Sequence, residues 1–225
     1  MNTPLDNPIW HSLRSRHAAL GDGGQHAACY DPDIAPFAGV ASADAQCGAA
    51  LATLLGDREP YYLVGVIPPV VPGWRLDDHG VIDQMLCARA PDLPDGPAMV
   101  ELGAGHVADM LELTALVFPG YFRRDTLRMG RYLGIYIGDR LAAMAGERMA
   151  LPGHREISAV CTHPDHTGRG YAQRLVAQVT RDVFAAGLLP FLHVSPGNTR
   201  AKQVYERLGY VDRAAVVLYA LHRDE

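Results

Sequence analysis

A strand, a glycine turn and a helix follow one another between Glu156 and Ala172, and this junction constrains the chain more than any other feature. Residues 157–162 are mostly apolar, as in a buried strand, and Gly168 and Gly170 follow in a short turn. Glycines let consecutive backbone N–H groups converge without Cβ atoms, and the helix that follows adds its positive N-terminal dipole. The sequence therefore predicts an anion site built from backbone, of the kind that holds a pyrophosphate.

The segment after this turn predicts a helix, a strand and a second helix. Gly187 is a stop for the first helix, residues 188–195 form a short apolar run, and Asn198 is positioned to cap a helix that Gly209 ends. The apolar positions of the first helix recur at helical spacing, and they are Leu175, Val176, Val179 and Val183.

Two better-known nucleotide loops do not fit these residues. A dinucleotide-binding fold needs a third glycine three positions after Gly170, and an acidic residue about 20 residues later. Gln173 and an apolar strand stand there instead. An NTPase loop needs Gly-Lys-Ser/Thr, and the only lysine of this chain is Lys202.

Taken together, the motifs resemble the GNAT superfamily of acetyl-CoA-dependent N-acyltransferases, and more narrowly its glycine N-acyltransferase-like branch. The resemblance spans roughly residues 100–221. It rests on the strand 157–162, the loop 167–172, the run Asn198-Thr199-Arg200-Ala201 and the run 205–210. It implies an α/β fold with a mixed sheet, the GNAT acyltransferase fold, in residues 98–225.

The resemblance also implies where acetyl-CoA binds. In such enzymes the central strand and the next strand splay apart, and the pantetheine arm lies between them. The loop binds the pyrophosphate, and Tyr205 faces the thioester sulfur. The cofactor-binding residues implied here are Val160, Cys161, Thr162, Thr167, Gly168, Arg169, Gly170, Tyr171, Ala172, Asn198 and Ala201.

One loop position departs from the family pattern. The family's loop usually opens with Arg or Gln, whereas this chain has Thr167. Arg169 or Arg174 is the expected substitute source of positive charge. Thr167 is also the one hint of a different class of function, a catalytically silent CoA-binding regulatory module.

Acyl transfer to an amine requires a base for the amine, a polarised thioester and an acid for the leaving thiolate. Glu156 stands where several GNAT members place a carboxylate base, and Glu112 or Glu147 acting through a water is the alternative. Tyr205 is the expected acid, because its phenol lies two turns into the helix capped by Asn198.

We therefore expect an N-acetyltransferase in which a primary amine, on a small molecule or a peptide, attacks acetyl-CoA directly. Other acyl-CoA donors and amino-acid acceptors stay open as alternatives. No metal is implied, because His163 and His166 lie in a proline turn without further ligands on a rigid element. Cys161 is expected to act as a small buried hydrophobe rather than a nucleophile. For residues 118–122, lining of the acceptor pocket and simple packing both stay open.

Composition favours a soluble cytoplasmic enzyme without a membrane or nucleic-acid partner. Of 225 residues, 48% are hydrophobic and 20% charged, no long apolar run or signal-like start occurs, and the net charge of −5 includes no basic stripe. Reduced thiols are expected because the four cysteines are widely spaced: Cys29, Cys47, Cys87 and Cys161.

Residues 1–97 form the other expected domain, a divergent α/β unit of unassigned role that ends in the proline-rich run 90–97. This domain could be a degenerate GNAT-like half, a lid over the acceptor site, or a surface for homodimerisation. Its expected elements are helices over 8–20 and 43–55, strands over 61–66 and 81–88, and loops over 21–24 and 67–73.

Overall fold

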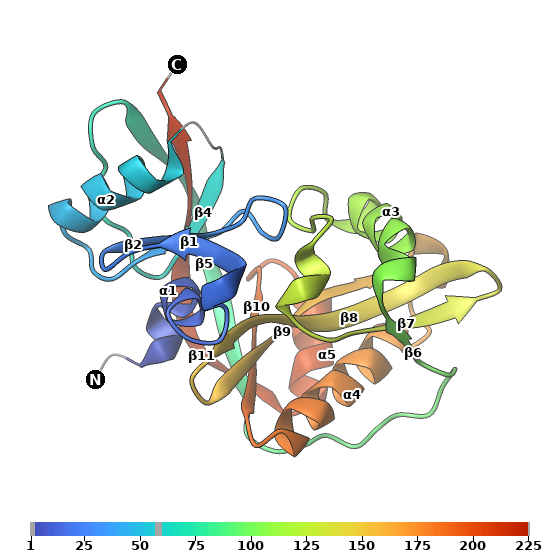
Figure 1. Cartoon of the computed structure of the whole chain (residues 1–225). Coiled ribbons are helices and arrows are strands. Elements are labelled where there is room, and N and C mark those ends of the chain that lie inside the picture. The colour runs from blue at the N-terminus through green and yellow to red at the C-terminus, as the bar shows by residue number, and fades with distance from the viewer. Residues whose placement is uncertain (1–2, 57–59, 225) are drawn as a thin grey trace. The chain divides into compact units, whose positions relative to one another are not determined.

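A computed structural model describes residues 3–56 and 60–224 of the chain (Figure 1). It divides into two compact units. The first unit comprises Met1–Ile82, Met149–Pro152 and Ala215–Glu225, and the second comprises Asp83–Arg148 and Gly153–Ala214. Three long strands run from one unit into the other: β5 (Trp74–Cys87), β8 (Arg140–Leu151) and β11 (Tyr210–Arg223).

The first unit combines a small antiparallel sheet, of order β1-β2-β3, with two helices. Helix α2 is capped by Asp44, whose side chain accepts a hydrogen bond from the Cys47 amide at 2.8 Å, and it buries Leu51 and Leu55 against the sheet. β4 pairs antiparallel with β11. The elements that lie wholly in this unit are α1 (Pro8–Leu13), β1 (Gly21–Gly23), β2 (Ala27–Tyr30), β3 (Ala38–Val40), α2 (Ala45–Leu55) and β4 (Tyr61–Val64).

The helix predicted to continue to Leu20 ends at Leu13, so the prediction was wrong beyond that residue. The chain turns there because its buried polar groups bond to one another. The Ser12 hydroxyl, His17 Nδ1 and the Tyr30 hydroxyl lie 2.8 to 3.2 Å apart, and the His17 amide donates to the Ser12 carbonyl. A continued helix would carry His17 away from these partners.

Three other predictions for this unit need correction. The glycines at 21–24 do not make a simple loop, because Gly21 to Gly23 pair with β2 so closely that a Cβ at Gly21 would lie 2.0 Å from the Cys29 carbonyl oxygen. β4 stops at Val64, since Gly65 takes a left-handed φ of +83°. The strand predicted from 81 begins earlier, at Trp74. The predicted loop over 67–73 and the helix over 43–55 are confirmed, the helix with a start at Ala45.

The second unit is a mixed sheet of order β5-β10-β9-β8-β7-β6 with helices on both faces (Figure 1). The mixed α/β fold expected from the sequence is confirmed. Its further elements are β6 (Val100–Leu102), α3 (Val107–Val117), β7 (Tyr132–Ile137), β9 (His154–Thr162), α4 (Tyr171–Ala185), β10 (Leu189–Val194) and α5 (Thr199–Arg207).

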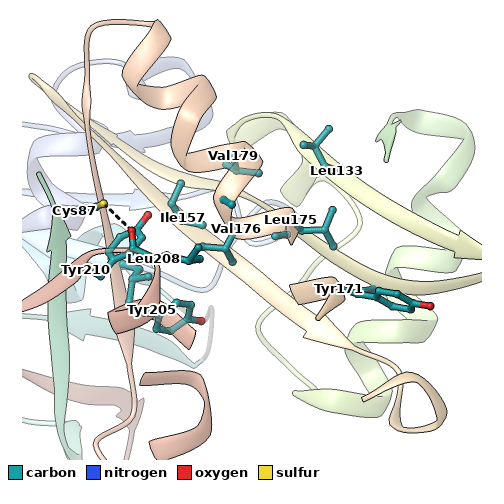
Figure 2. Close-up of a cluster of buried hydrophobic side chains, with 14 of the residues drawn as sticks. Cys87, Leu133, Ile157, Tyr171, Leu175, Val176, Val179, Tyr205, Leu208 and Tyr210 are labelled. Atoms are coloured by element: carbon teal, nitrogen blue, oxygen red, sulfur yellow. Dashed lines mark hydrogen bonds between the residues drawn. The ribbon is translucent and has the colours of Figure 1, made fainter. Parts of the chain in front are cut away.

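Alternation along the strands sends side chains to the two faces of this sheet. Leu133 of β7 packs on the α4 face, whereas its neighbour Tyr132 packs on the α3 face. Figure 2 shows Leu175, Val176 and Val179 of α4 gathered with residues of the sheet and of α5. The 3.6-residue periodicity seen in the sequence is therefore the buried face of α4.

The proline-rich run around residues 90–97 has no helix or strand, as expected, but it is fastened to α4. Arg174 donates from Nε to the Pro97 carbonyl at 3.0 Å and from Nη1 to the Pro94 carbonyl. Arg181 donates to the Pro91 carbonyl at 3.0 Å. The run thus lies inside the second unit, which begins at Asp83 rather than at 98. The role of residues 1–97 stays a prediction.

None of the helices in residues 3–56 and 60–224 has the length and apolar character that a membrane-crossing helix requires.

Candidate active site

A fork between two parallel strands positions the site. β9 and β10 pair only where Leu189–Phe191 lies beside His154–Glu156. Three residues after Glu156, Ala159 takes a φ of +51°, a left-handed conformation that is uncommon for a residue other than glycine. The second half of β9 therefore keeps backbone groups that β10 does not bind, as the family resemblance implied.

A cleft of about 440 Å³ lies beside this fork. It contains each cofactor-binding residue predicted from the sequence, together with Tyr205. Glu156 is not among its lining residues. The lining residues are Val117, Val160, Cys161, Thr162, His166, Thr167, Gly168, Arg169, Gly170, Tyr171, Ala172, Gln173, Asn198, Arg200, Ala201, Val204, Tyr205 and Arg207.

The glycine loop presents backbone donors to this cleft. Gly168 and Gly170 have φ values of +80° and +76°, and a Cβ placed on either would meet no atom within 4 Å. Gly170 is the N-cap residue of α4, and no side chain caps the first turn of the helix. The amides of that turn have no partner within the helix, so they and the helix dipole are available to an anion.

Arginines surround the loop, although not the ones expected. Arg174 is engaged with the Pro94 and Pro97 carbonyls, so its suggested phosphate role is not supported. Arg169, Arg200 and Arg207 line the cleft, and among the described residues none of the three forms an ion pair. The Thr167 hydroxyl donates to the Pro164 carbonyl at 3.1 Å. No carboxylate occurs among the described lining residues, which leaves the cleft suited to a polyanion.

Tyr205 enters the cleft from α5. Asn198 caps this helix by accepting a hydrogen bond from the Ala201 amide at 3.2 Å, as predicted, and its side-chain amide group remains able to donate into the cleft. The Tyr205 ring is 7% exposed and packs 6.0 Å from the ring of Tyr210 (Figure 2). Burial raises the pKa of Tyr205 to about 12, so the phenol stays protonated at neutral pH.

Glu156 has surroundings that disfavour the predicted role as base. Its side chain is fully buried, and Arg148 donates to both carboxylate oxygens at 2.5 and 2.8 Å. His193 Nδ1 lies 2.7 Å from Oε1. Burial alone would raise the pKa of this carboxyl, but Arg148 and His193 outweigh burial and hold the pKa well below its usual range. A carboxylate so fully bonded is a weak proton acceptor, and the base role stays a prediction that these contacts disfavour.

The alternative bases also lie off the cleft. Glu147 pairs with Arg155 at 3.3 Å, and Glu112 lines a separate hollow beside α3. Burial raises the pKa of the Cys161 thiol to about 12, which agrees with its expected role as a small hydrophobe. Among the described residues no cluster of three or more His, Cys, Asp or Glu side chains is arranged to hold a metal ion.

Sequence reasoning missed six residues of the cleft: Val117, His166, Gln173, Arg200, Val204 and Arg207. Three of these carried a usable signal. Arg200, Val204 and Arg207 are spaced by four and three residues, so they share one face of α5 with Ala201 and Tyr205 nearby. Of the others, Val117 ends α3, His166 lies in the turn before the glycine loop and Gln173 lies in the first turn of α4, and no pattern in the sequence points to their place in the cleft.

Comparison with known proteins places this arrangement in a family. A family model for FR47-like protein matches residues 132–218. A structure assigned to the GNAT acetyltransferases, from Novosphingobium aromaticivorans, is 37% identical over 100% of both chains, with a TM-score of 0.89.

More distant structures share the fold. A GCN5-related N-acetyltransferase from Kribbella flavida is 19% identical, with a TM-score of 0.64 over 94% of this chain and 91% of its own. A GCN5-related N-acetyltransferase-like protein from Streptococcus suis is 16% identical, with a TM-score of 0.55 over 95% and 92%. Comparison with curated proteins finds no match. The identity over the full length to the Novosphingobium structure shows that the chain belongs to the GNAT family of acetyltransferases.

Proposed function

We propose that this protein transfers an acetyl group from acetyl-CoA to a primary amine by direct attack. The observation that carries the proposal is a cleft that combines strand backbone without pairing to β10, a helix N-terminus that no side chain caps and a buried phenol. These are the three features that binding a pantetheine arm, binding a pyrophosphate and protonating a thiolate require.

The residues present fit acetyl-CoA. Backbone groups near Val160 and Thr162 would hold the pantetheine arm, and the amides of Gly168 to Ala172 would hold the pyrophosphate. Arg169, Arg200 and Arg207 would supply positive charge, which replaces what the family's usual loop residue provides at the position of Thr167. When bound, acetyl-CoA supplies an activated thioester, and everything else must come from the chain.

Tyr205 is the proposed acid. A phenol whose pKa is about 12 is protonated at every physiological pH, so its O–H can donate to the sulfur as the C–S bond breaks. The new bond is the amide N–C bond, the broken bond is C–S, and the sulfur leaves as the thiol of CoA with the proton from Tyr205. The Tyr205 phenolate then takes a proton back from solvent, which balances the proton that the amine loses to solvent. The hydrophobic contacts around Tyr205 hold the ring in place for this donation.

The amine proton has no carboxylate to receive it among the described residues of the cleft. We propose that it passes to solvent, and that the acceptor reacts as the fraction of amine already neutral. The rate at low acceptor concentration should then rise with pH up to the pKa of the acceptor.

Finer assignments also belong to this proposal. The glycine N-acyltransferase-like branch, other acyl-CoA donors and amino-acid acceptors are compatible with the cleft, and the acceptor is proposed as a small molecule or a peptide. The four described cysteines are buried free thiols, which supports a reducing compartment such as the cytoplasm.

Two experiments test the proposal in sequence. Calorimetric titration with acetyl-CoA should show one site, and melting should shift upward by mass action. An amine panel with detection of released thiol should then show turnover with at least one acceptor. Binding without turnover on any amine would favour the silent regulatory module, and no binding at millimolar acetyl-CoA would overturn the function.

A further inference from the structure

A chain of partly buried hydrogen bonds crosses the sheet of the second unit, where the pairing of β9 with β10 ends. It links five side chains on five neighbouring strands, from β8 through β9, β10 and β5 to β11. Within it, the side chains of Glu156 and Gln84 are fully buried, and that of His193 is 4% exposed. The members are Arg148, Glu156, His193, Gln84 and Arg213.

The direction of these bonds is fixed by chemistry. Arg213 can only donate, so the bond at 2.8 Å assigns the amide oxygen of Gln84 to it. The Gln84 amide nitrogen then donates to His193 Nε2 at 3.0 Å, and His193 Nδ1 donates to Glu156 at 2.7 Å. Arg148 donates to the same carboxylate from the other side. Every hydrogen bond in the series is therefore donated in the direction of Glu156, and each side chain has a single orientation that makes all of its bonds in the series.

The position of the chain matters as much as its direction. Glu156 is the last residue of β9 that pairs with β10, and His193 lies two residues beyond Phe191, its pairing partner. The bond between Glu156 and His193 thus joins the two strands where their backbone ladder ends. Val160 lies four residues after Glu156 on β9, and Asn198 lies five residues after His193. Both Val160 and Asn198 line the cleft.

We propose that Glu156 and His193 form a positioning pair that fixes how far β9 and β10 separate, and so sets the width of the cleft for CoA. The proposal rests on the proposed function, because it concerns the same cleft. Arg148 on one side and Gln84 with Arg213 on the other hold the pair in its single orientation. Neither member touches the reacting atoms, so both act through the strands that they join.

Two substitutions at His193 separate this role from plain stabilisation. His193→Leu removes both hydrogen bonds of the ring. His193→Asn keeps a donor close to the place of Nδ1 and so retains the bond to Glu156. Thr180→Val is the matched control, since it removes a buried 2.7 Å bond to Tyr210 in the same unit without touching the fork.

The measurement is the dissociation constant of CoA itself, by calorimetry well below each melting temperature. His193→Leu should weaken CoA about ten-fold and raise KM for acetyl-CoA more than it lowers kcat, because a shift of the strands misplaces the arm. His193→Asn should recover most of the affinity. Thr180→Val should lower the melting temperature and leave the affinity unchanged.

Several outcomes overturn the proposal. Wild-type affinity in folded His193→Leu would do so, as would equal loss of affinity in His193→Asn and His193→Leu. If His193→Leu does not fold, His193→Phe replaces it, because it keeps a ring at this position but forms neither hydrogen bond, and an unchanged CoA affinity there would have the same meaning. Failure of the proposed function looks different, because the wild-type protein itself would then bind no CoA.

Discussion

The two halves of strand β9 differ in what their polar groups are bonded to. In the first half, His154–Glu156 pairs with β10, and Glu156 is buried with bonds from Arg148 and His193. In the second half, after the left-handed Ala159, Val160 to Thr162 face a cleft and have no partner in β10. The difference teaches that one strand can stabilise the fold at the end that pairs with β10 and supply a binding surface at the end that does not.

The largest effect is expected from a substitution in the glycine loop, which leaves the half of β9 that pairs with β10 unchanged. Gly170→Val should reduce activity about 1,000-fold or more and abolish measurable CoA binding. The branched side chain would occupy the anion site of the glycine loop, and it would disfavour the left-handed φ of this residue. Acetyl-CoA titration and thiol release measure this.

Gly153→Val is the matched control for Gly170→Val. Gly153 has a φ of +75° and equally open surroundings, and it lies in the turn that leads into the paired end of β9. It should show a similar loss of stability, on the order of 1–3 kcal/mol, with CoA binding retained. Equal loss of CoA binding in the two variants would mean that backbone strain causes the loss, rather than obstruction of the anion site.

Tyr205→Phe should give the next largest effect. Turnover should fall about 10- to 1,000-fold, with little change in CoA affinity or melting temperature, because only the hydroxyl is lost. Since burial raises the Tyr205 pKa to about 12, the wild-type rate should show no alkaline decline from this group below about pH 11. Unchanged turnover in the variant would return Tyr205 to a packing role.

Glu156→Gln should act mainly on stability. Removing one partner of a buried, bonded charge pair costs roughly 3–5 kcal/mol, which urea unfolding would measure. In the wild type the folded-state pKa of Glu156 lies below the unfolded value of 4.5, so this contribution is present above pH 4.5 and is lost as pH falls below it.

The Glu156→Gln variant should lack the part of the loss of stability at low pH that protonation of Glu156 causes in the wild type. A base role for Glu156 would instead leave stability nearly intact and reduce turnover most at low pH, with recovery as the free amine becomes abundant.

The smallest expected effects are at the rim of the cleft. Arg200→Ala and Arg207→Ala should each weaken CoA roughly 3- to 10-fold, and the loss should shrink as salt is added, because exposed charges are screened. Arg174→Ala provides the contrast, since Arg174 is engaged with the Pro94 and Pro97 carbonyls. If Arg174→Ala weakens CoA more than the other two, the assignment of charges around the loop is wrong.

Local patterns account for the parts of the fold and site that the sequence predicted. The spacing of Leu175, Val176 and Val179 predicts α4. Gly168 and Gly170 predict the anion site, and Asn198 predicts the start of α5. In each case the determining interaction lies within about a turn of the residue concerned, and such interactions are visible along a sequence.

Contacts between distant segments account for what the sequence did not predict. Glu156 looked like a base until Arg148 and His193, eight and 37 residues away, were brought to it by the neighbouring strands. Arg174 looked like a phosphate ligand, but carbonyls 77 and 80 residues away engage it. Pairing across strands is set by the tertiary fold, so a single sequence holds no local record of it.

Hydrogen–deuterium exchange with and without saturating acetyl-CoA tests the central claim most directly. We expect slower exchange at the amides of Gly168 to Gln173 and at the second half of β9, Val160 to Thr162, with no change at Arg155 and Glu156. This result would show that the cofactor occupies the end of β9 that does not pair with β10. Protection elsewhere, or no protection at all at saturation, would contradict the account.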